Sequence, residues 1–191
     1  MLHPCSLLGC SLLPVAVLAA STLSAAPAEA RVIDHARFNE VFSIPVPDVC
    51  GVRAIHSRDV VVTFKINLRG GLVYFADHVR GTEAFTNVES GRTMTTVFTT
   101  HVHDLVVTDN GDGTLTVRVH RTRNFTILDD EGNRVGQDTG TMMSELLVDH
   151  GGTPSDPVDD TILSTQRVVK ESTGLNEIGA TFCEDFLAIT G

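Results

Sequence analysis

Two histidines, His101 and His103, lie one residue apart in the stretch TTHVHDLVV, shortly before an obvious turn. Alternate residues of a β-strand point to the same face, so both imidazoles are expected on one face of a sheet. Counting pairs back across the flanking turns places Asp77 opposite His103 and Arg121 opposite His101. The sequence therefore predicts a polar belt of these four residues on an inner face that is otherwise apolar.

Three kinds of chemistry suit this predicted belt. A carboxylate that is hydrogen-bonded to a histidine fixes the imidazole tautomer and raises its basicity, so Asp77 and His103 can orient a ligand or accept a proton. Two histidines and a carboxylate can also hold iron or zinc. The positive charge of Arg121 argues against a cation, however, and we predict no metal. In the third interpretation both histidines are ordinary strand residues, and neighbouring groups form hydrogen bonds with their ring nitrogens.

The register of the belt depends on two hairpins. A three-residue loop, Glu89–Gly91, gives the register used above. A bulge at Gly81 would shift it by one residue and bring His78 opposite His101 instead. Pairing the apolar residues across the next turn leaves His120 on the outer face.

Period-two alternation of apolar and polar residues runs through most of the chain and predicts β-strands. The predicted strands cover residues 60–68, 72–79, 83–88, 93–108, 114–128, 141–149, 161–171 and 180–189. Segments rich in glycine, aspartate and asparagine at 89–91, 109–113 and 129–133 predict tight hairpin turns. Residues 171–178 fit either a short helix or a loop.

About eight antiparallel strands joined by tight turns indicate an all-β, up-and-down meander. A flat meander of that size would expose two edges, so closure into a barrel is favoured, with a two-sheet sandwich as the alternative. A barrel of about eight strands can fill its interior or hold one small ligand.

An apolar segment followed by small residues opens the chain and predicts a secretory signal peptide over residues 1–30. Ala28-Glu29-Ala30 fits the A-x-A cleavage pattern and makes Arg31 the first mature residue, while Ser24-Ala25-Ala26 is a second cleavage option. The apolar run is too short to span a bilayer, and we expect no membrane anchor. Residues 31–191 then form one secreted, extracellular domain.

Cys50 and Cys183 are the two cysteines that follow the predicted signal peptide. An even pair of cysteines in an oxidising compartment predicts a disulfide. The bond would close a loop of more than 130 residues, worth roughly 4–5 kcal/mol on the loop-entropy model. It would join the start of the meander to its last strand, as closure of a barrel requires.

The composition and the motifs exclude several function classes. The formal net charge is −10, and an acidic chain repels phosphate, so we expect neither nucleic acid nor anionic membranes as partners. The acidic turns do not place ligands at the spacing of an EF-type calcium loop. The chain contains no G-x-S-x-G, no P-loop and no G-x-G-x-x-G motif, and we predict no catalytic residue and no cofactor.

The early Cys50, the hairpin FADHVRGTEAFTNVESGR and the terminal FCEDF resemble the small secreted β-barrel proteins of unknown function found in actinobacteria. The chain is also broadly similar to calycin-like and allene-oxide-cyclase-like barrels. It departs from lipocalins in lacking their G-x-W signature, because it contains no Trp. The resemblance implies a barrel fold without naming an activity.

Together these observations predict a secreted, non-enzymatic β-barrel that binds a small, partly apolar molecule in its lumen or serves as an extracellular accessory protein. The predicted ligand-contacting residues are Asp77, His101, His103 and Arg121. The alternative is a cyclase or isomerase that uses the predicted Asp77–His103 pair, and fold analogy alone does not decide between the two.

Overall fold

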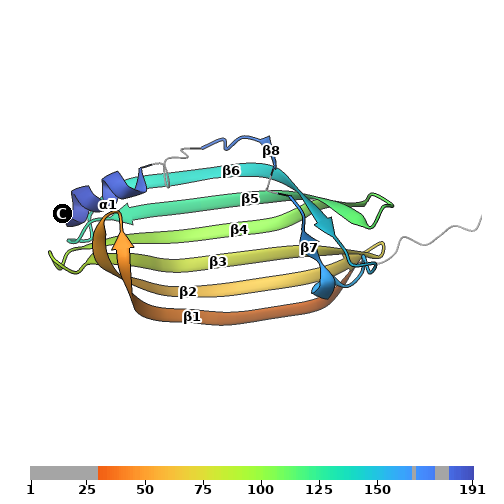
Figure 1. Ribbon diagram of the computed structural model, residues 1–191, viewed down its shortest axis with the longest axis horizontal. Helices are drawn as coiled ribbons and strands as arrows, with labels where there is room; N and C mark the ends of the chain where they lie inside the picture. Colours follow the sequence, from red (N-terminus) through yellow and green to blue (C-terminus); the bar gives the residue numbers. More distant parts are fainter. Residues whose placement is uncertain (1–29, 165–166, 175–180) are drawn as a thin grey trace, which may run out of the picture.

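Long alternating segments form one antiparallel sheet, in which each strand pairs with the next along the chain (Figure 1). The computed structural model describes residues 30–164, 167–174 and 181–191. Its elements are β1 (Arg31–Val49), β2 (Val52–Arg69), β3 (Leu72–Asn87), β4 (Thr93–Asp109), β5 (Thr114–Leu128), β6 (Arg134–Asp149), a 3-10 turn (Pro157–Asp159), β7 (Thr161–Ile162), β8 (Arg167–Lys170) and α1 (Phe182–Thr190). The predicted all-β antiparallel meander is confirmed.

The sheet is open rather than closed. Its strand order is β1 to β7 in sequence, and β8 also pairs with β6. In the described part of the chain β1 pairs only with β2, so the predicted barrel closure is not seen. All eight strands belong to this one sheet, which also differs from the two-sheet alternative.

The predicted turns are present, and aspartate side chains shape two of them. Asp109 accepts a hydrogen bond from the backbone N–H of Gly111 at 2.8 Å, and Asp129 accepts one from Asn133 at 2.7 Å. In both turns the aspartate carboxylate accepts the hydrogen bond of a backbone N–H group that has no strand partner.

The C-terminal segment is a helix, and the predicted strand over 180–189 is wrong. Phe182, Phe186 and Ile189 follow the spacing of one helix face, although a run this short is difficult to assign to helix or strand from the sequence. Two acidic residues in the first turn, Glu184 and Asp185, favour the helix because its N-terminus carries partial positive charge. The other C-terminal prediction, a helix or loop over 171–178, falls partly outside the described residues.

Helix α1 packs on one face of the sheet, near the β1–β2 turn. Phe186 is fully buried and joins a core of Val49, Ala54, Met94 and Ile127. These sheet residues come from four strands or strand ends and share one face, because directly paired residues of antiparallel strands point the same way. We call this the concave face, since the sheet curves around it (Figure 1).

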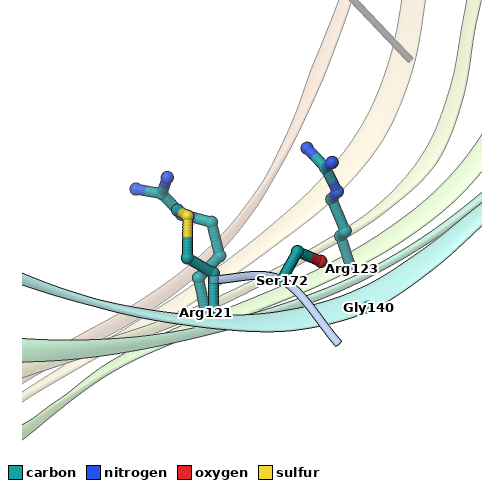
Figure 2. A pocket seen from close by; sticks show the side chains of 5 residues that line it. Arg121, Arg123, Gly140 and Ser172 are labelled. Atoms are coloured by element: carbon teal, nitrogen blue, oxygen red, sulfur yellow. The ribbon is translucent and has the colours of Figure 1, made fainter. Parts of the chain in front are cut away.

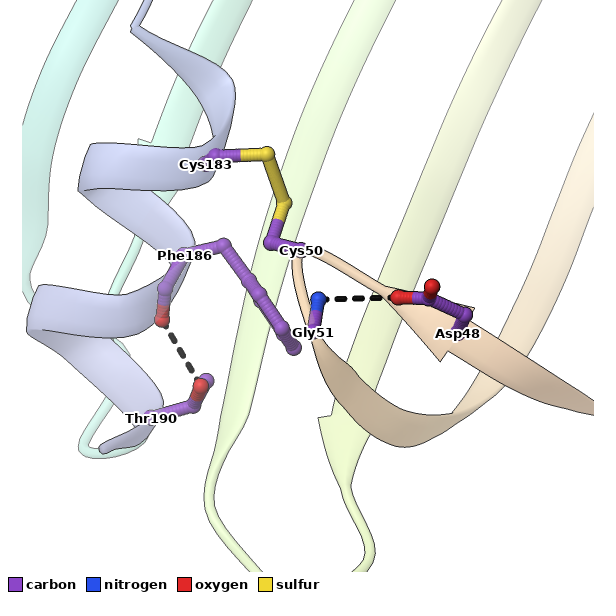
Figure 3. The surroundings of a disulfide bond; sticks show 6 residues. All are labelled: Asp48, Cys50, Gly51, Cys183, Phe186 and Thr190. Carbon is purple, nitrogen blue, oxygen red and sulfur yellow. Dashed lines mark hydrogen bonds between the residues drawn. A yellow bond between two sulfur atoms is a disulfide. The ribbon is translucent and has the colours of Figure 1, made fainter.

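The predicted disulfide between Cys50 and Cys183 is confirmed (Figure 3). It ties the β1–β2 turn to the first turn of α1. Cys50 and Gly51 both have positive φ, as a tight two-residue hairpin requires. The N–H of Gly51 donates to the Asp48 carboxylate at 2.8 Å and fixes the turn that presents the cysteine.

The concave face collects the aromatic side chains. The register places on it every phenylalanine of the six long strands, namely Phe38, Phe42, Phe64, Phe75, Phe85, Phe98 and Phe125. Phe98 and Phe125 stack with ring centroids 5.5 Å apart. The remaining two of the nine phenylalanines, Phe182 and Phe186, lie in α1.

Gly81 does not form the predicted bulge. Its pairs with Val60 and Phe98 belong to ladders that run through it without a shift. A Cβ atom at Gly81 would lie 2.1 Å from the carbonyl oxygen of Asp59 on β2. The glycine is therefore required for close approach of two strands, which is the other reason for a glycine inside a strand.

Replacing both Cys50 and Cys183 by alanine should lower the free energy of unfolding. The bond spans 133 residues, and loss of a native disulfide of this kind costs roughly 2–5 kcal/mol because the unfolded chain gains freedom. Urea unfolding with and without reductant is the measurement. The oxidised protein should lose stability on reduction and the double variant should not respond; two titratable thiols in the oxidised protein would contradict the bond.

Gly81→Ala should destabilise the fold more than Gly111→Ala. Gly111 has positive φ with open space around it, so alanine there costs about 1–2 kcal/mol of backbone strain alone. At Gly81 the backbone of β2 must move as well, and we expect a loss above ~3 kcal/mol. Equal midpoints of the two variants in urea would show that the strands do not approach as closely as described.

Candidate functional site

The structure separates the four residues of the predicted polar belt. Asp77 pairs with Val102, whereas His103 pairs with Ala76 on β3. Neighbouring pairs of a ladder point to opposite faces. Asp77 therefore lies on the concave face and His103 on the opposite, convex face, and the predicted contact between them is wrong.

The length of one turn explains the error. Asn87 and Arg92 close the β3–β4 turn, with the N–H of Asn87 donating to the carbonyl oxygen of Arg92 at 3.0 Å. Four residues therefore lie in the loop where three were predicted, and the register moves by one residue. His78 consequently pairs with His101, which is the arrangement that a bulge at Gly81 would have produced.

The β4–β5 register also differs from the prediction. His103 pairs with His120, and a shift between Asp104 and Val106 resets the ladder beyond that point. His120 does face outward as predicted. Its partner His103 and the neighbouring His101 share that outer face, which the alternation of the sequence did not indicate.

Asp77 and Arg121 remain together on the concave face, because both pair with Val102 from opposite sides. Burial raises the pKa of Asp77, and the Val102 backbone and the Arg121 charge oppose that rise. Asp77 on β3 and Arg121 on β5 are therefore separated by β4, in a row of residues that is otherwise apolar. Phe64 on β2 is the next residue of this row, beside Asp77.

An ion pair lies next to this row. Arg123 Nη2 is 3.0 Å from Asp138 Oδ2, and the Asp138 side chain is fully buried. Figure 2 shows Arg121 and Arg123 rising from β5 on the inner side of the curve. With Met142 and Ser172 they line a cavity of about 20 Å³, which is large enough for about one water molecule.

Polar groups also gather near the helical end of the concave face. His56 Nε2 lies 2.7 Å from Glu83 Oε1, and Arg58 lies 3.6 Å from the same carboxylate. The His56 ring stacks on Phe85 at 4.5 Å and meets the edge of Phe42 at 5.0 Å. This end is filled by its own side chains, whereas the middle of the face carries Asp77, Arg121 and the Arg123–Asp138 pair close to aromatic rings.

Asp104 is a further carboxyl on the concave face, and sequence reasoning missed it. It accepts a hydrogen bond from the backbone N–H of Phe75 at 2.7 Å, just beyond the last β3–β4 pair. Burial raises its pKa to about 6. The signal that would reveal it is the register itself, since Asp104 joins the same face as Asp77 only once the turn length is known.

A hollow of about 780 Å³ lies near the start of β1 and the end of β2. Its lining comes from both faces of the sheet, because it includes consecutive residues of each strand. The lining residues are Val32, Ile33, Asp34, His35, Thr63, Phe64 and Lys65. The volume is within the range of small-molecule sites, and Phe64 connects the hollow to the aromatic surface of the concave face.

No known protein family, curated protein or solved structure matches this chain. The resemblance to small secreted barrels therefore stays a prediction. Among the described residues no three His, Cys, Asp or Glu side chains are arranged to hold a metal ion. Within the same ranges, no helix is both long and apolar enough to cross a membrane.

Asp104→Asn should stabilise the protein at pH 7 relative to the native chain and have little effect at pH 4. Because the pKa of Asp104 is raised from 3.8 to about 6, the folded state binds the proton more tightly than the unfolded state. Its contribution to stability is present below pH 4 and is lost as the pH rises through 6. The amide oxygen of asparagine can still accept from Phe75.

Melting temperatures of the native chain and of Asp104→Asn between pH 4 and pH 7 test whether the substitution becomes stabilising as the pH rises. Asp112→Asn is the control, because hydrogen bonds from Thr114 lower the pKa of Asp112. That exposed substitution should act in the opposite direction and become destabilising as the pH rises above the ordinary aspartate range. A difference between Asp104→Asn and the native chain that does not change with pH would contradict the burial of this carboxyl.

Proposed function

We propose that this protein is a secreted, non-enzymatic binding protein whose concave sheet face takes up a small, partly apolar, anionic molecule. The observation that carries the proposal is the gathering of all seven strand phenylalanines on that face. Phe38 is 46% exposed and Phe75 is 38% exposed. Aromatic side chains that remain in water on a curved surface favour a site for an apolar group.

Charge in the middle of the face supports an anionic end for the ligand. Arg121 and Arg123 rise from the same strand on the concave side (Figure 2). Asp138 neutralises Arg123 at 3.0 Å, and Arg121 lies in the same row as Asp77, so the middle of the face carries both signs of charge. A small number of charged groups within an apolar surface is what orients an amphipathic molecule.

The enzyme alternative loses its support. A cyclase or isomerase would need Asp77 and His103 within hydrogen-bond reach. The two side chains lie on opposite faces of the sheet. In the proposed function the concave face of the open sheet takes the place of the lumen of the predicted barrel.

Two features support secretion. The disulfide between Cys50 and Cys183 is typical of an oxidising compartment. Strand β1 begins at Arg31, the residue that the predicted cleavage would leave at the N-terminus. Removal of residues 1–30 would therefore leave the whole described sheet intact.

Anilinonaphthalene sulfonate, a small aromatic anion, is a suitable probe because its fluorescence rises in an apolar site. We expect Phe38→Ala to weaken its binding about tenfold, since an aromatic contact is worth roughly 1.5 kcal/mol or more. Val41→Ala is the matched control. Val41 lies on the same strand, is 68% exposed and faces the convex side.

A second pair of variants, one on each face of the sheet, tests whether Arg121 contributes to anion binding. Arg121→Gln should weaken the probe severalfold, and the effect should shrink in high salt. Arg118→Gln should leave binding unchanged, because Arg118 faces the convex side and pairs with Glu145 at 2.7 Å. Equal effects of the concave and convex variants, or no saturable binding, would overturn the proposed function.

A further inference from the structure

Strand β1 is a long edge strand, and no segment in the described part of the chain pairs with its outer side (Figure 1). It runs over Arg31–Val49, and most of its residues are exposed. The opposite edge of the sheet differs, because the short strands β7 and β8 pair with β6 there. An unpaired edge presents free backbone N–H and C=O groups with which another strand can pair.

The backbone directions in β2 identify which residues of β1 offer these free groups. The carbonyl oxygen of Arg53 accepts a hydrogen bond from the N–H of Val88 at 3.0 Å, so Arg53 faces β3. Directions alternate along a strand, so the even-numbered residues of β2 face β1 instead. Their partners are the even-numbered residues 36–46 of β1. The backbone groups of the odd-numbered residues 35–43 therefore point outward, away from the sheet.

Pro45 supports this assignment. It pairs with Ile55, which faces β3, so the Pro45 nitrogen lies on the outer side of β1. Proline in a sheet is confined to such positions because it has no N–H to donate. Pro45 limits the free backbone on one side, and the register shift between Val32 and Asp34 limits it on the other. We call residues 35–43, which lie between these limits, the free edge.

We propose that two copies of this chain form a symmetric dimer by pairing their free edges, β1 against β1, in antiparallel order. The side chains of Arg37 and Glu40 cancel in charge, so the free edge is formally neutral although the whole chain carries −10. Two acidic chains therefore repel each other least along this edge. Because β7 and β8 cover part of the other edge, the pairing closes at two copies and does not continue as a fibre.

The side chains of the free edge select one register. A two-fold axis perpendicular to the sheet joins residues of the same face. An axis at Arg37 or at Glu40 would oppose that residue to its own copy, and like charges directly opposite are destabilising. An axis at Asn39 or at Val41 would place a phenylalanine opposite Glu40. An axis at Phe38 avoids these contacts and pairs two aromatic rings, which is favourable in a sheet.

This register uses the backbone groups of His35, Arg37, Asn39 and Val41 in each copy. Each pair of outward residues exchanges two hydrogen bonds, so the interface contains about eight. The two concave faces become one continuous surface with the Phe38 rings at the junction. The dimer requires no ligand and is tested without one, so its failure would leave the proposed function standing.

Oxidative cross-linking of Phe38→Cys tests the position of the axis. Phe38 faces β2, so its pair across the axis carries no hydrogen bonds, and the two Cα atoms should lie about 4.5 Å apart. That separation allows a disulfide. Phe42→Cys is the matched control, because it lies on the same strand and face but roughly 26 Å from its copy in this register. We expect a covalent dimer from Phe38→Cys and essentially none from Phe42→Cys.

Sedimentation equilibrium of the disulfide-bonded chain tests the dimer itself and its backbone origin. Asn39→Pro removes one outward N–H from each copy, and so two hydrogen bonds from the interface, while its pairing with β2 needs no such donor. We expect the dissociation constant of the dimer to rise more than about tenfold. Asn39→Ala is the matched control, because it removes the same side chain and keeps the N–H, and it should change the constant less than about threefold.

Urea midpoints of the two Asn39 variants establish that both chains are folded, and the cysteine variants test the dimer independently of the proline. A native chain that remains monomeric up to about 500 µM would overturn the proposal. Cross-linking of Phe42→Cys as readily as Phe38→Cys would overturn it as well. So would a folded Asn39→Pro chain that dimerises as tightly as Asn39→Ala.

Discussion

The four-residue turn between β3 and β4 decides on which face of the sheet every side chain of those two strands lies. One residue fewer in that turn would bring Asp77 opposite His103 and exchange the faces of β4 relative to β3. With the observed turn, His78 meets His101 on the convex face and Asp77 lies beside Val102 on the concave one. The aromatic surface, the positions of Asp77 and Asp104 and the pairing of the histidines all depend on this register, because a slip of one residue moves a whole strand to the other face.

The same constraint explains what sequence reasoning could and could not predict. Alternation and turn chemistry are local properties, so most of β2 to β6 and the hairpins between β3 and β6 followed from them, whereas β1 was not predicted. The Cys50–Cys183 bond followed from the even number of cysteines after the predicted signal peptide. Pairing register is a relation between strands, and the segment around Ser90 is compatible with more than one loop length. The C-terminal helix was missed although Phe182, Phe186 and Ile189 share a helix face and not a strand face, because a short apolar run is hard to assign to either structure. Closure into a barrel was predicted because an open sheet exposes two edge strands. That is a general tendency of β-proteins, and individual sheets can remain open.

The two faces carry different chemistry. The concave face combines exposed aromatic rings with Arg121, Arg123 and buried carboxyls, and α1 covers one end of it through Phe186. The disulfide holds that helix to the β1–β2 turn (Figure 3). The convex face carries His78, His101, His103 and His120. A single sheet can therefore carry different chemistry on its two faces, because its side chains alternate between them.

Backbone NOEs across β3 and β4 test the register most directly. The account predicts contacts between backbone protons of His78 and His101, of Asp77 and Val102, and of Ala76 and His103. It also predicts contacts of His103 with His120 on β5. Strong backbone contacts between Asp77 and His103, with none between His78 and His101, would contradict it. That result would place His101 and His103 on the same face as Asp77, separate Phe98 from the phenylalanines of β3, and remove the basis of the proposed binding surface.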